Sequence, residues 1–276
     1  MSAIMSAIPQ ALQSFADASM AMFEQGKIRA LALPANTVQV WPGGATFTTI
    51  QAAINSITNA SPQVEYQVAV GPGTYNETVT MIDYIYITGA GSDQTTITAN
   101  ATGSPFNGVV NSSSNSGISE VTIKAVGTNW GDWPCGIKIM GAGEFHISGV
   151  NIITTDNNVA GCNVRGISNN TGSYTANIIF GQSTLQASGV QESTAVGIEL
   201  FGMSGATIFC NLSAIQVTGA TQTFGVSTAV NATATLTDCK IIASTWALYN
   251  SDGSAQITAN QCTIDGPVSS GVVVNN

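Results

Sequence analysis

Three segments between Val38 and Thr98 decide the fold: VQVWPGGATFTTIQAAINSI (38–57), VEYQVAVGPGTYNETVTM (64–81) and YIYITGAGSDQTTIT (84–98). The first predicts a strand, a Trp-Pro-Gly-Gly turn and then a short helix whose N-cap is Thr49. Apolar residues recur after it at helical spacing, namely Ile50, Ala53, Ile54 and Ile57. The other two segments alternate inward and outward residue types and stop at Gly-Pro-Gly (71–73) and Gly-Ala-Gly (89–91), which is typical of short strands ending in turns.

This order resembles the opening of the pectin methylesterases and of related members of the pectin-lyase-like, right-handed parallel β-helix group. In that group a T-I-Q-x-A-I helix and a P-G-x-Y turn begin the solenoid. The matching residues here are Thr49, Ile50, Gln51, Ala53 and Ile54, followed by Pro72, Gly73 and Tyr75. The resemblance implies an all-β chain folded as a right-handed parallel β-helix, and it is more specific for the fold than for an activity.

From residue 117 the chain repeats a unit with an apolar residue first, a small or β-branched residue fourth, and Ile or Leu sixth. The first positions are Ile118, Ile147, Phe180, Cys210, Leu236 and Ala259, and the last are Ile123, Ile152, Leu185, Ile215, Ile241 and Ile264. A second column, mostly Gly-Ile or Gly-Val, follows in step at 136–137, 166–167, 197–198, 225–226, 247–248 and 271–272. Two columns in step predict a β-solenoid of about eight or nine coils, with both apolar columns buried and stacked.

Both ends of the solenoid need cover, because terminal coils expose unpaired backbone groups and apolar core. Residues 1–30 are expected to form a separate capping α-helix, and residues 31–276 a single β-helix domain. Pro9 suits the first turn of the helix, and Gly26 suits its end. A membrane-surface helix is the alternative, but Lys27 and Arg29 lie beyond the apolar stretch, so its polar face lacks cations.

The last eight residues, Ser269–Asn276, predict one more strand in the Gly-Ile column. No helix, proline or charged residue follows to cover that strand, so its edge is a template for pairing with another chain. We therefore expect an oligomer or a partner at the C-terminal coil. The alternative is a monomer whose last coil is shielded by a folded-back loop at Asp252–Gly253 or Asp265–Pro267.

The composition excludes several classes of function. Only 8% of the residues are charged, 44% are hydrophobic, and six basic residues leave a net charge of −9. A nucleic-acid partner or an anionic membrane surface is not expected, because no basic stripe is present. There is no run of 18 apolar residues, so membrane insertion is not expected. There is also no phosphate-binding or dinucleotide motif, so no cofactor is expected. The N-terminus lacks the basic region of a secretory signal, although an extracellular or particle-associated location is favoured.

Five cysteines occur without a C-x-x-C spacing, so no metal site is expected. Cys239 and Cys262 fall in the same column one coil apart, where a disulfide would fit. The alternative is a ladder of free cysteines, which behave as small buried hydrophobes in a column that holds Val and Ser elsewhere.

The catalytic motifs that the resemblance implies are missing. Pectin methylesterases use Q-D-T-L, D-F-I-F-G and R-P-W, with two aspartates and an arginine, and none of the three is intact here. The segment Asn177–Gly181 is similar to the second, but an amide stands where the nucleophilic carboxylate belongs, and Phe180 falls in the first repeat column. Lyase chemistry needs a basic residue and commonly calcium. The coils hold only Lys124, Lys138, Arg165 and Lys240 as cations and no Asp-rich cluster. No catalytic residue is assigned.

The best candidate for ligand binding is the loop 129–134 and the strand after it. Its two tryptophans can offer flat faces to sugar rings, and the column of Lys138 continues in later coils with Ser168 and Glu199. The predicted site is a shallow groove with Trp130, Asp132, Trp133, Lys138 and Glu199. The alternative is that the tryptophans only pack the loop onto the solenoid flank.

Two functions remain. The first is a non-catalytic β-helix with a structural, adhesive or polysaccharide-binding role in a larger assembly. The second is a divergent carbohydrate-active enzyme, pectinesterase-like or lyase-like, acting on an extracellular polysaccharide. Ice binding is weaker, because Thr233, Thr235 and Thr237 do not repeat in register across the coils.

Overall fold

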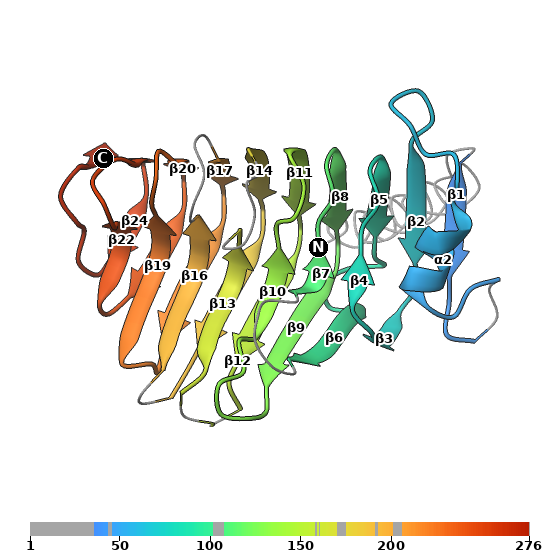
Figure 1. Ribbon diagram of the computed structural model, residues 1–276, viewed down its shortest axis with the longest axis horizontal. Coiled ribbons are helices and arrows are strands. Elements are labelled where there is room, and N and C mark those ends of the chain that lie inside the picture. The colour runs from blue at the N-terminus through green and yellow to red at the C-terminus, as the bar shows by residue number, and fades with distance from the viewer. Residues whose placement is uncertain are drawn as a thin grey trace, which may run out of the picture. The chain divides into compact units, whose positions relative to one another are not determined.

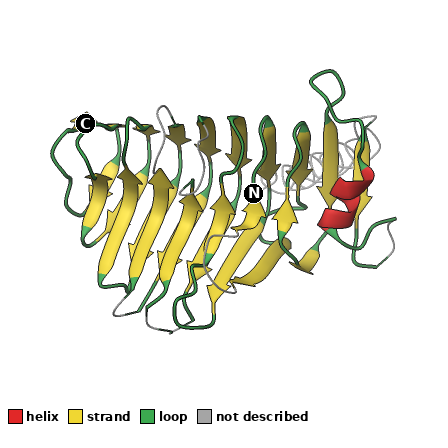
Figure 2. Cartoon of the chain, in the orientation of Figure 1, coloured by secondary structure: helices red, strands yellow, loops and turns green. Residues whose placement is uncertain are grey.

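The computed structural model describes residues 36–43, 46–101, 108–157, 159, 161–169, 175–190, 193–200 and 206–275. The chain divides into two compact units, Met1–Thr37 and Val38–Asn276. Because the described residues begin at 36, the capping helix predicted for residues 1–30 lies outside them. In the second unit almost every element is a short strand, and one short helix accompanies them (Figure 2).

Successive strands go in turn to three parallel sheets, which we call sheet one, sheet two and sheet three (Figure 1). Sheet one contains β1 (Thr37–Val40), β2 (Tyr66–Val70), β5 (Ile85–Thr88), β8 (Ser116–Ser119), β11 (Gly143–Ser148), β14 (Ala176–Gly181), β17 (Thr207–Asn211), β20 (Thr233–Thr237), β23 (Gln256–Asn260) and β25 (Val272–Asn275). Sheet two contains β3 (Gly73–Asn76), β6 (Thr95–Ala101), β9 (Thr122–Gly127), β12 (Asn151–Thr155), β15 (Thr184–Ser188), β18 (Ala214–Thr218), β21 (Lys240–Ala243) and β24 (Thr263–Asp265). Sheet three contains β4 (Val79–Thr80), β7 (Gly108–Asn111), β10 (Cys135–Lys138), β13 (Asn163–Ser168), β16 (Thr194–Leu200), β19 (Gln222–Thr228) and β22 (Trp246–Asn250).

This topology is a right-handed parallel β-helix, as predicted. Within the described residues, seven coils place a strand in each of the three sheets. An eighth coil begins with β23 and β24, and it meets sheet three only through an isolated bridge between Leu248 and Val268. Partial turns at both ends account for the difference from the eight or nine coils expected.

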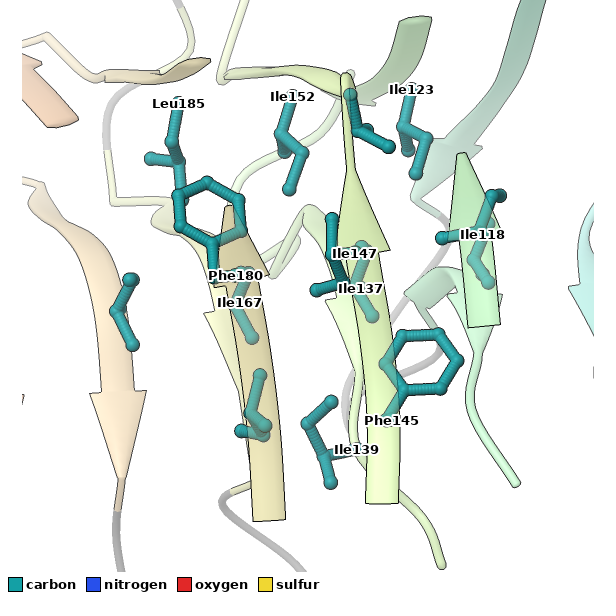
Figure 3. Packing of buried hydrophobic residues seen from close by; sticks show 14 of the residues in the cluster. Ile118, Ile123, Ile137, Ile139, Phe145, Ile147, Ile152, Ile167, Phe180 and Leu185 are labelled. Atoms are coloured by element: carbon teal, nitrogen blue, oxygen red, sulfur yellow. The ribbon is translucent and has the colours of Figure 1, made fainter. Parts of the chain in front are cut away.

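The two apolar columns of the repeat are stacked inside the solenoid. Ile147 pairs with Ile118 on one side and Phe180 on the other, and Figure 3 shows these side chains facing the interior. The column continues through Cys210, Leu236 and Ala259, and the sheet-two column runs from Ile123 through Ile152, Leu185, Ile215 and Ile241 to Ile264. All are buried except Ile264, which is partly buried against the core. The predicted register is confirmed.

The Gly-Ile column lies in sheet three, where Ile137, Ile167 and Ile198 pair directly and are buried. The preceding glycines are needed for close approach. A Cβ at Gly197 would lie 2.5 Å from the carbonyl oxygen of Gly225 and 2.6 Å from Cγ2 of Ile215.

The assignment of residues 271–272 to the Gly-Ile column is wrong. Val272 pairs with Ile257 in sheet one, and Val268 takes the expected place beside Leu248. The last loop is shorter than the column spacing implied, because Gly266 and Pro267 return the chain directly to β22, where the carbonyl of Pro267 accepts the N–H of Ala247 at 2.8 Å.

The helix α2 (Ile50–Ser56) opens the solenoid as predicted, and Thr49 is its N-cap. Glu77 explains why this helix and the following turn occur together. Its carboxylate accepts the N–H groups of Ile50 at 2.8 Å and Gln51 at 3.0 Å, which satisfies free donors at the positive end of the helix. Gln51 in turn accepts the N–H of Thr80 in β4 at 2.7 Å. The helix is thus tied to the first coil by its own Gln51 and by Glu77, which lies two residues after the P-G-x-Y turn.

Candidate functional site

Two rows of side chains run across the outer side of sheet three, and we call them together the polar–aromatic face. The first row is Cys135, Arg165, Val196, Phe224 and Trp246, and the second is Lys138, Ser168, Glu199, Ser227 and Tyr249. Cys135 and Val196 are buried hydrophobic residues, but none of the ten joins the main apolar cluster, which contains the Ile137 column between the rows. The strands that carry them, β10, β13, β16, β19 and β22, lie side by side in Figure 1.

A buried ion pair holds the centre of this face. Arg165 Nε donates to Glu199 Oε2 at 2.5 Å, and Ser168 Oγ donates to the same oxygen at 2.6 Å. Arg165 also donates through Nη1 to the carbonyl of Asn163 at 3.1 Å. Arg165 is 7% exposed and Glu199 3% exposed, so neither charge is solvated as it would be at a surface. Each charge therefore depends on the other for compensation.

One end of the face continues from this pair into β10 and the loop before it. The guanidinium carbon of Arg165 lies 4.5 Å from the ring centroid of half-buried Trp133, a cation–π contact. Burial raises the pKa of the neighbouring Cys135 thiol to about 12, so this cysteine is protonated at neutral pH and is no nucleophile. Burial lowers the pKa of Lys138, whose place in the row is next to Ser168.

The other end of the face is aromatic. The rings of Phe224 and Tyr249 are 5.2 Å apart and those of Trp246 and Tyr249 5.4 Å apart, in tilted arrangements. All three side chains are half-buried, so part of each ring faces solvent. This cluster was not predicted from the sequence. Its signal lies one residue before and one residue after the Gly-Ile column, where Phe224, Trp246 and Tyr249 occupy consecutive coils.

Loop 129–134 separates the two tryptophans. The Trp130 side chain is 80% exposed and rests against Gly161, where a Cβ would lie 2.4 Å from the indole Nε1. Asp132 is 2% exposed, and its Oδ2 accepts the N–H groups of Thr128 and Asn129 at 2.8 Å each. This carboxylate oxygen therefore closes the loop on itself, and ligand binding by Asp132 stays a prediction.

The five predicted residues are thus only partly brought together. Trp133 and Glu199 meet through Arg165, which the prediction omitted, whereas Trp130 lies at the surface of the loop. Lys138 and Glu199 share a row across Ser168 as expected, and both are buried. The shallow ligand-binding groove stays a prediction. Glu199 forms its ion pair with Arg165, which lies three residues before Ser168 in β13.

The segment Asn177–Gly181, which is similar to a catalytic motif, lies in β14 of sheet one and not on this face. Phe180 is fully buried between Ile147 and Cys210, as its place in the repeat predicts. Among the described residues, no three or more His, Cys, Asp or Glu side chains are grouped to hold a metal ion. The described part of the chain also has no helix long and apolar enough to cross a membrane.

The same arrangement of coils occurs in solved structures. Pectin methylesterase from carrot superimposes with a TM-score of 0.55 at 14% identity, covering 88% of this chain and 86% of that chain. The chain has the pectin-lyase-like β-helix fold. Pectin methylesterase PemA from Erwinia chrysanthemi is similar at a TM-score of 0.54 and 11% identity, over 89% of this chain and 94% of that chain. Pectin methylesterase from Aspergillus niger is similar at a TM-score of 0.54 and 13% identity, over 89% of this chain and 82% of that chain.

No protein-family model matches the sequence, and no curated protein matches it. At these identities the likeness concerns the fold alone. The activity of this pectin-lyase-like β-helix has to be argued from its own side chains.

Proposed function

We propose that this protein is a non-catalytic, polysaccharide-binding β-helix with a structural or adhesive role, and that the polar–aromatic face binds the sugar chain. The observation that carries the proposal is the aromatic cluster of Phe224, Trp246 and Tyr249 on the same face as the Arg165–Glu199 pair. Sugar rings pack their CH groups on aromatic faces, while polar side chains bind the hydroxyl groups.

The dimensions of the face suit a polymer. Neighbouring strands of a sheet are 4.7–4.9 Å apart, so the five strands from β10 to β22 span about 19 Å. Binding groups are distributed along this length, with Trp133 at one end and Trp246 at the other. An extended chain contacts several of them at once, and a monosaccharide contacts only one.

The charges on the face argue against hydrolysis. Glycoside hydrolysis uses two carboxyl groups on opposite sides of the scissile bond. Among the ten residues of the face, Glu199 is the one carboxylate, and one of its oxygens already accepts from Arg165 and Ser168. Its role in this proposal is to hold Arg165, and through it Trp133, in place.

One observation favours a second candidate, a divergent carbohydrate esterase. Ser168 Oγ donates to Glu199 at 2.6 Å, and a hydroxyl beside a carboxylate is the basic arrangement of an activated nucleophile. This candidate requires release of methanol or acetate from an esterified polysaccharide, and Ser168→Ala must abolish it.

Affinity electrophoresis of the purified chain in gels containing pectin, alginate or a neutral glucan tests binding. Pectin comes first because the solved structures from carrot and Erwinia chrysanthemi that share this fold are pectin methylesterases. We expect retardation by at least one polymer, about tenfold weaker binding for Trp246→Ala, and no change for Trp41→Ala. Trp41 is a matched control because it is 50% exposed but packs against Gly71 at the first coil. Binding that is equal in both variants would contradict the assignment of the face.

The proposed assembly concerns a different part of the molecule. Among the described strands β25 pairs with β23 on one side only, and its Val273 and Val274 are 52% and 39% exposed. We propose that a second copy of the chain pairs with this edge, because an exposed apolar edge strand offers both hydrogen-bonding groups and apolar area.

A further inference from the structure

The corner between sheet one and sheet two has the same backbone in six successive coils. The residue after each sheet-one strand has a φ between 48° and 64°: Glu120, Gly149, Gln182, Leu212, Asp238 and Gln261. The next residue is small or β-branched: Val121, Val150, Ser183, Ser213, Cys239 and Cys262. We call this second set, from Val121 to Cys262, the corner column. Since the backbone repeats, a side chain at one corner meets the same backbone groups as the corresponding side chain one coil away.

Serine and cysteine make the same contact in this column. Ser183 Oγ and Ser213 Oγ each donate at 2.8 Å to the carbonyl two residues earlier. Cys239 Sγ and Cys262 Sγ do so at 3.2 Å. The hydroxyls also accept a backbone N–H from the preceding coil, as in the 3.3 Å bond from Ser183 N to Ser213 Oγ. The Cys239→Ser variant is therefore expected to fold like the wild type.

Cys239 differs from the serines because a second thiol faces it. Cys210 is a buried residue near the end of β17, and its Sγ lies 3.3 Å from Cys239 Sγ. Cys239 Sγ also lies 3.4 Å from the carbonyl oxygen of Cys210. The two residues are 29 positions apart and lie in adjacent coils. The sulfurs already face each other, so a disulfide of about 2.05 Å requires only a small side-chain rotation.

Cys239 is 2% exposed, but it borders an open hollow at the surface. It lines an open hollow of about 580 Å³, which extends over the corners of four coils and includes Ser183, Ser213 and Lys240. The thiol hydrogen bond from Cys210 lowers the pKa of Cys239, and the same hydrogen bond and burial raise the pKa of Cys210. Burial raises the pKa of Cys135 and of Cys162. Burial raises the pKa of Cys262 as well. Of the five cysteines, Cys239 is thus the one whose pKa is lowered, and it lines the hollow.

We propose that Cys210 and Cys239 are a thiol modification site, at which reaction with a small disulfide such as oxidised glutathione produces an intramolecular Cys210–Cys239 disulfide. The Cys239 thiolate attacks one sulfur of the reagent, which forms a mixed disulfide and releases one thiolate. Cys210 then loses its proton to water and attacks Cys239 Sγ, which releases the second thiolate. The two protein thiols give up two electrons and two protons, and the reagent takes them up as two thiols. The product links two adjacent coils covalently.

The test is to incubate the folded full-length chain with oxidised glutathione, block remaining thiols, and map the peptides without reduction. We expect a mass lower by about 2 Da before blocking, from the loss of two thiol hydrogens, and a peptide pair joining Cys210 to Cys239. Cys239→Ser and Cys210→Ser should each abolish the pair. Cys262→Ser is the matched control, because this residue has the same corner contact but is not the one 3.3 Å from Cys210.

The outcomes are distinct. A Cys210–Cys239 pair that persists in Cys262→Ser and disappears in Cys239→Ser supports the site. A pair joining Cys239 to Cys262, a stable glutathione adduct without a second step, or a link between two molecules would each overturn it. Full recovery of all five thiols after exposure of the folded protein would overturn it as well.

Discussion

Removing one member of the Arg165–Glu199 pair tests whether the centre of the polar–aromatic face is closed in solution. The side chains are 8% and 4% exposed and their atoms approach to 2.5 Å. A surface pair contributes at most about 1 kcal/mol, but breaking a buried pair leaves an uncompensated charge and costs about 3–5 kcal/mol. We expect each of Arg165→Met and Glu199→Leu to lower the free energy of unfolding by that amount.

The double variant gives the sharper measurement. With both charges replaced by apolar side chains of similar length, neither position leaves a charge without its partner, and we expect a stability within about 2 kcal/mol of the wild type. The cycle should therefore yield a coupling free energy at or above the usual upper range of about 3 kcal/mol. Urea unfolding followed by circular dichroism, with an unchanged slope against denaturant, supplies the four values.

A loss of less than about 1 kcal/mol in both single variants would contradict a buried pair, because a pair of that strength is solvated. Glu199 would then be available to a ligand, and the esterase candidate would gain from it. A large loss with intact polysaccharide binding in the double variant would instead show that the pair supports the face without touching the sugar.

Three further predictions concern stability and assembly. Phe180→Ala should cost about 3–5 kcal/mol in urea unfolding because its ring is fully buried, whereas Phe209→Ala, 51% exposed on the next strand, should cost less than about 0.5 kcal/mol. Leu212→Asn should raise the free energy of unfolding by about 0.5–1 kcal/mol, because asparagine tolerates the φ of 48° at this exposed corner; Leu212→Val, measured as its counterpart, should lower it. Sedimentation of the wild type at micromolar concentration should give a species heavier than 28.2 kDa, and Val273→Lys with Val274→Lys should restore the monomer; a wild-type monomer would exclude the proposed edge pairing.

The columns of the β-helix could be predicted from the sequence because each coil repeats the same inward positions. Ile147, Phe180 and Cys210 occupy one column although the intervals between them differ, since loops absorb the extra residues outside the stacked strands. The row of Lys138, Ser168 and Glu199 followed from the same counting, and their pairing is confirmed. What repeats with the coil is therefore readable without a structure.

The partner of Glu199 was not readable in this way. In a regular strand residues three apart face opposite sides, so Arg165 and Ser168 would be separated by the sheet. Here both reach the same carboxylate, because Gly166 and Ile167 both face the interior: a Cβ at Gly166 would lie 2.5 Å from Leu185 Cδ1, and Ile167 is buried. The alternation of the strand is thus interrupted at Gly166 and Ile167, and this interruption brings two rows onto one outer face.

The glycine column therefore has a role in the site as well as in packing, which gives the last prediction. In Gly197→Ala the new Cβ would meet the Gly225 carbonyl oxygen at 2.5 Å and Ile215 Cγ2 at 2.6 Å, and the oxygen belongs to a backbone that cannot rotate away. We expect a loss of about 1–3 kcal/mol in urea unfolding, as for other overpacked interiors.

Glu199 is two residues further along the same strand, so the shift that relieves this clash should also displace its carboxylate from Arg165. Polysaccharide binding should then weaken under conditions in which the variant is still folded. Gly181→Ala is the matched control, because its Cβ would meet nothing nearer than 4.0 Å and its stability and binding should stay unchanged. If Gly197→Ala lost stability but bound the polymer as well as the control, the glycine at position 197 would serve packing alone, and the polar–aromatic face would not depend on it.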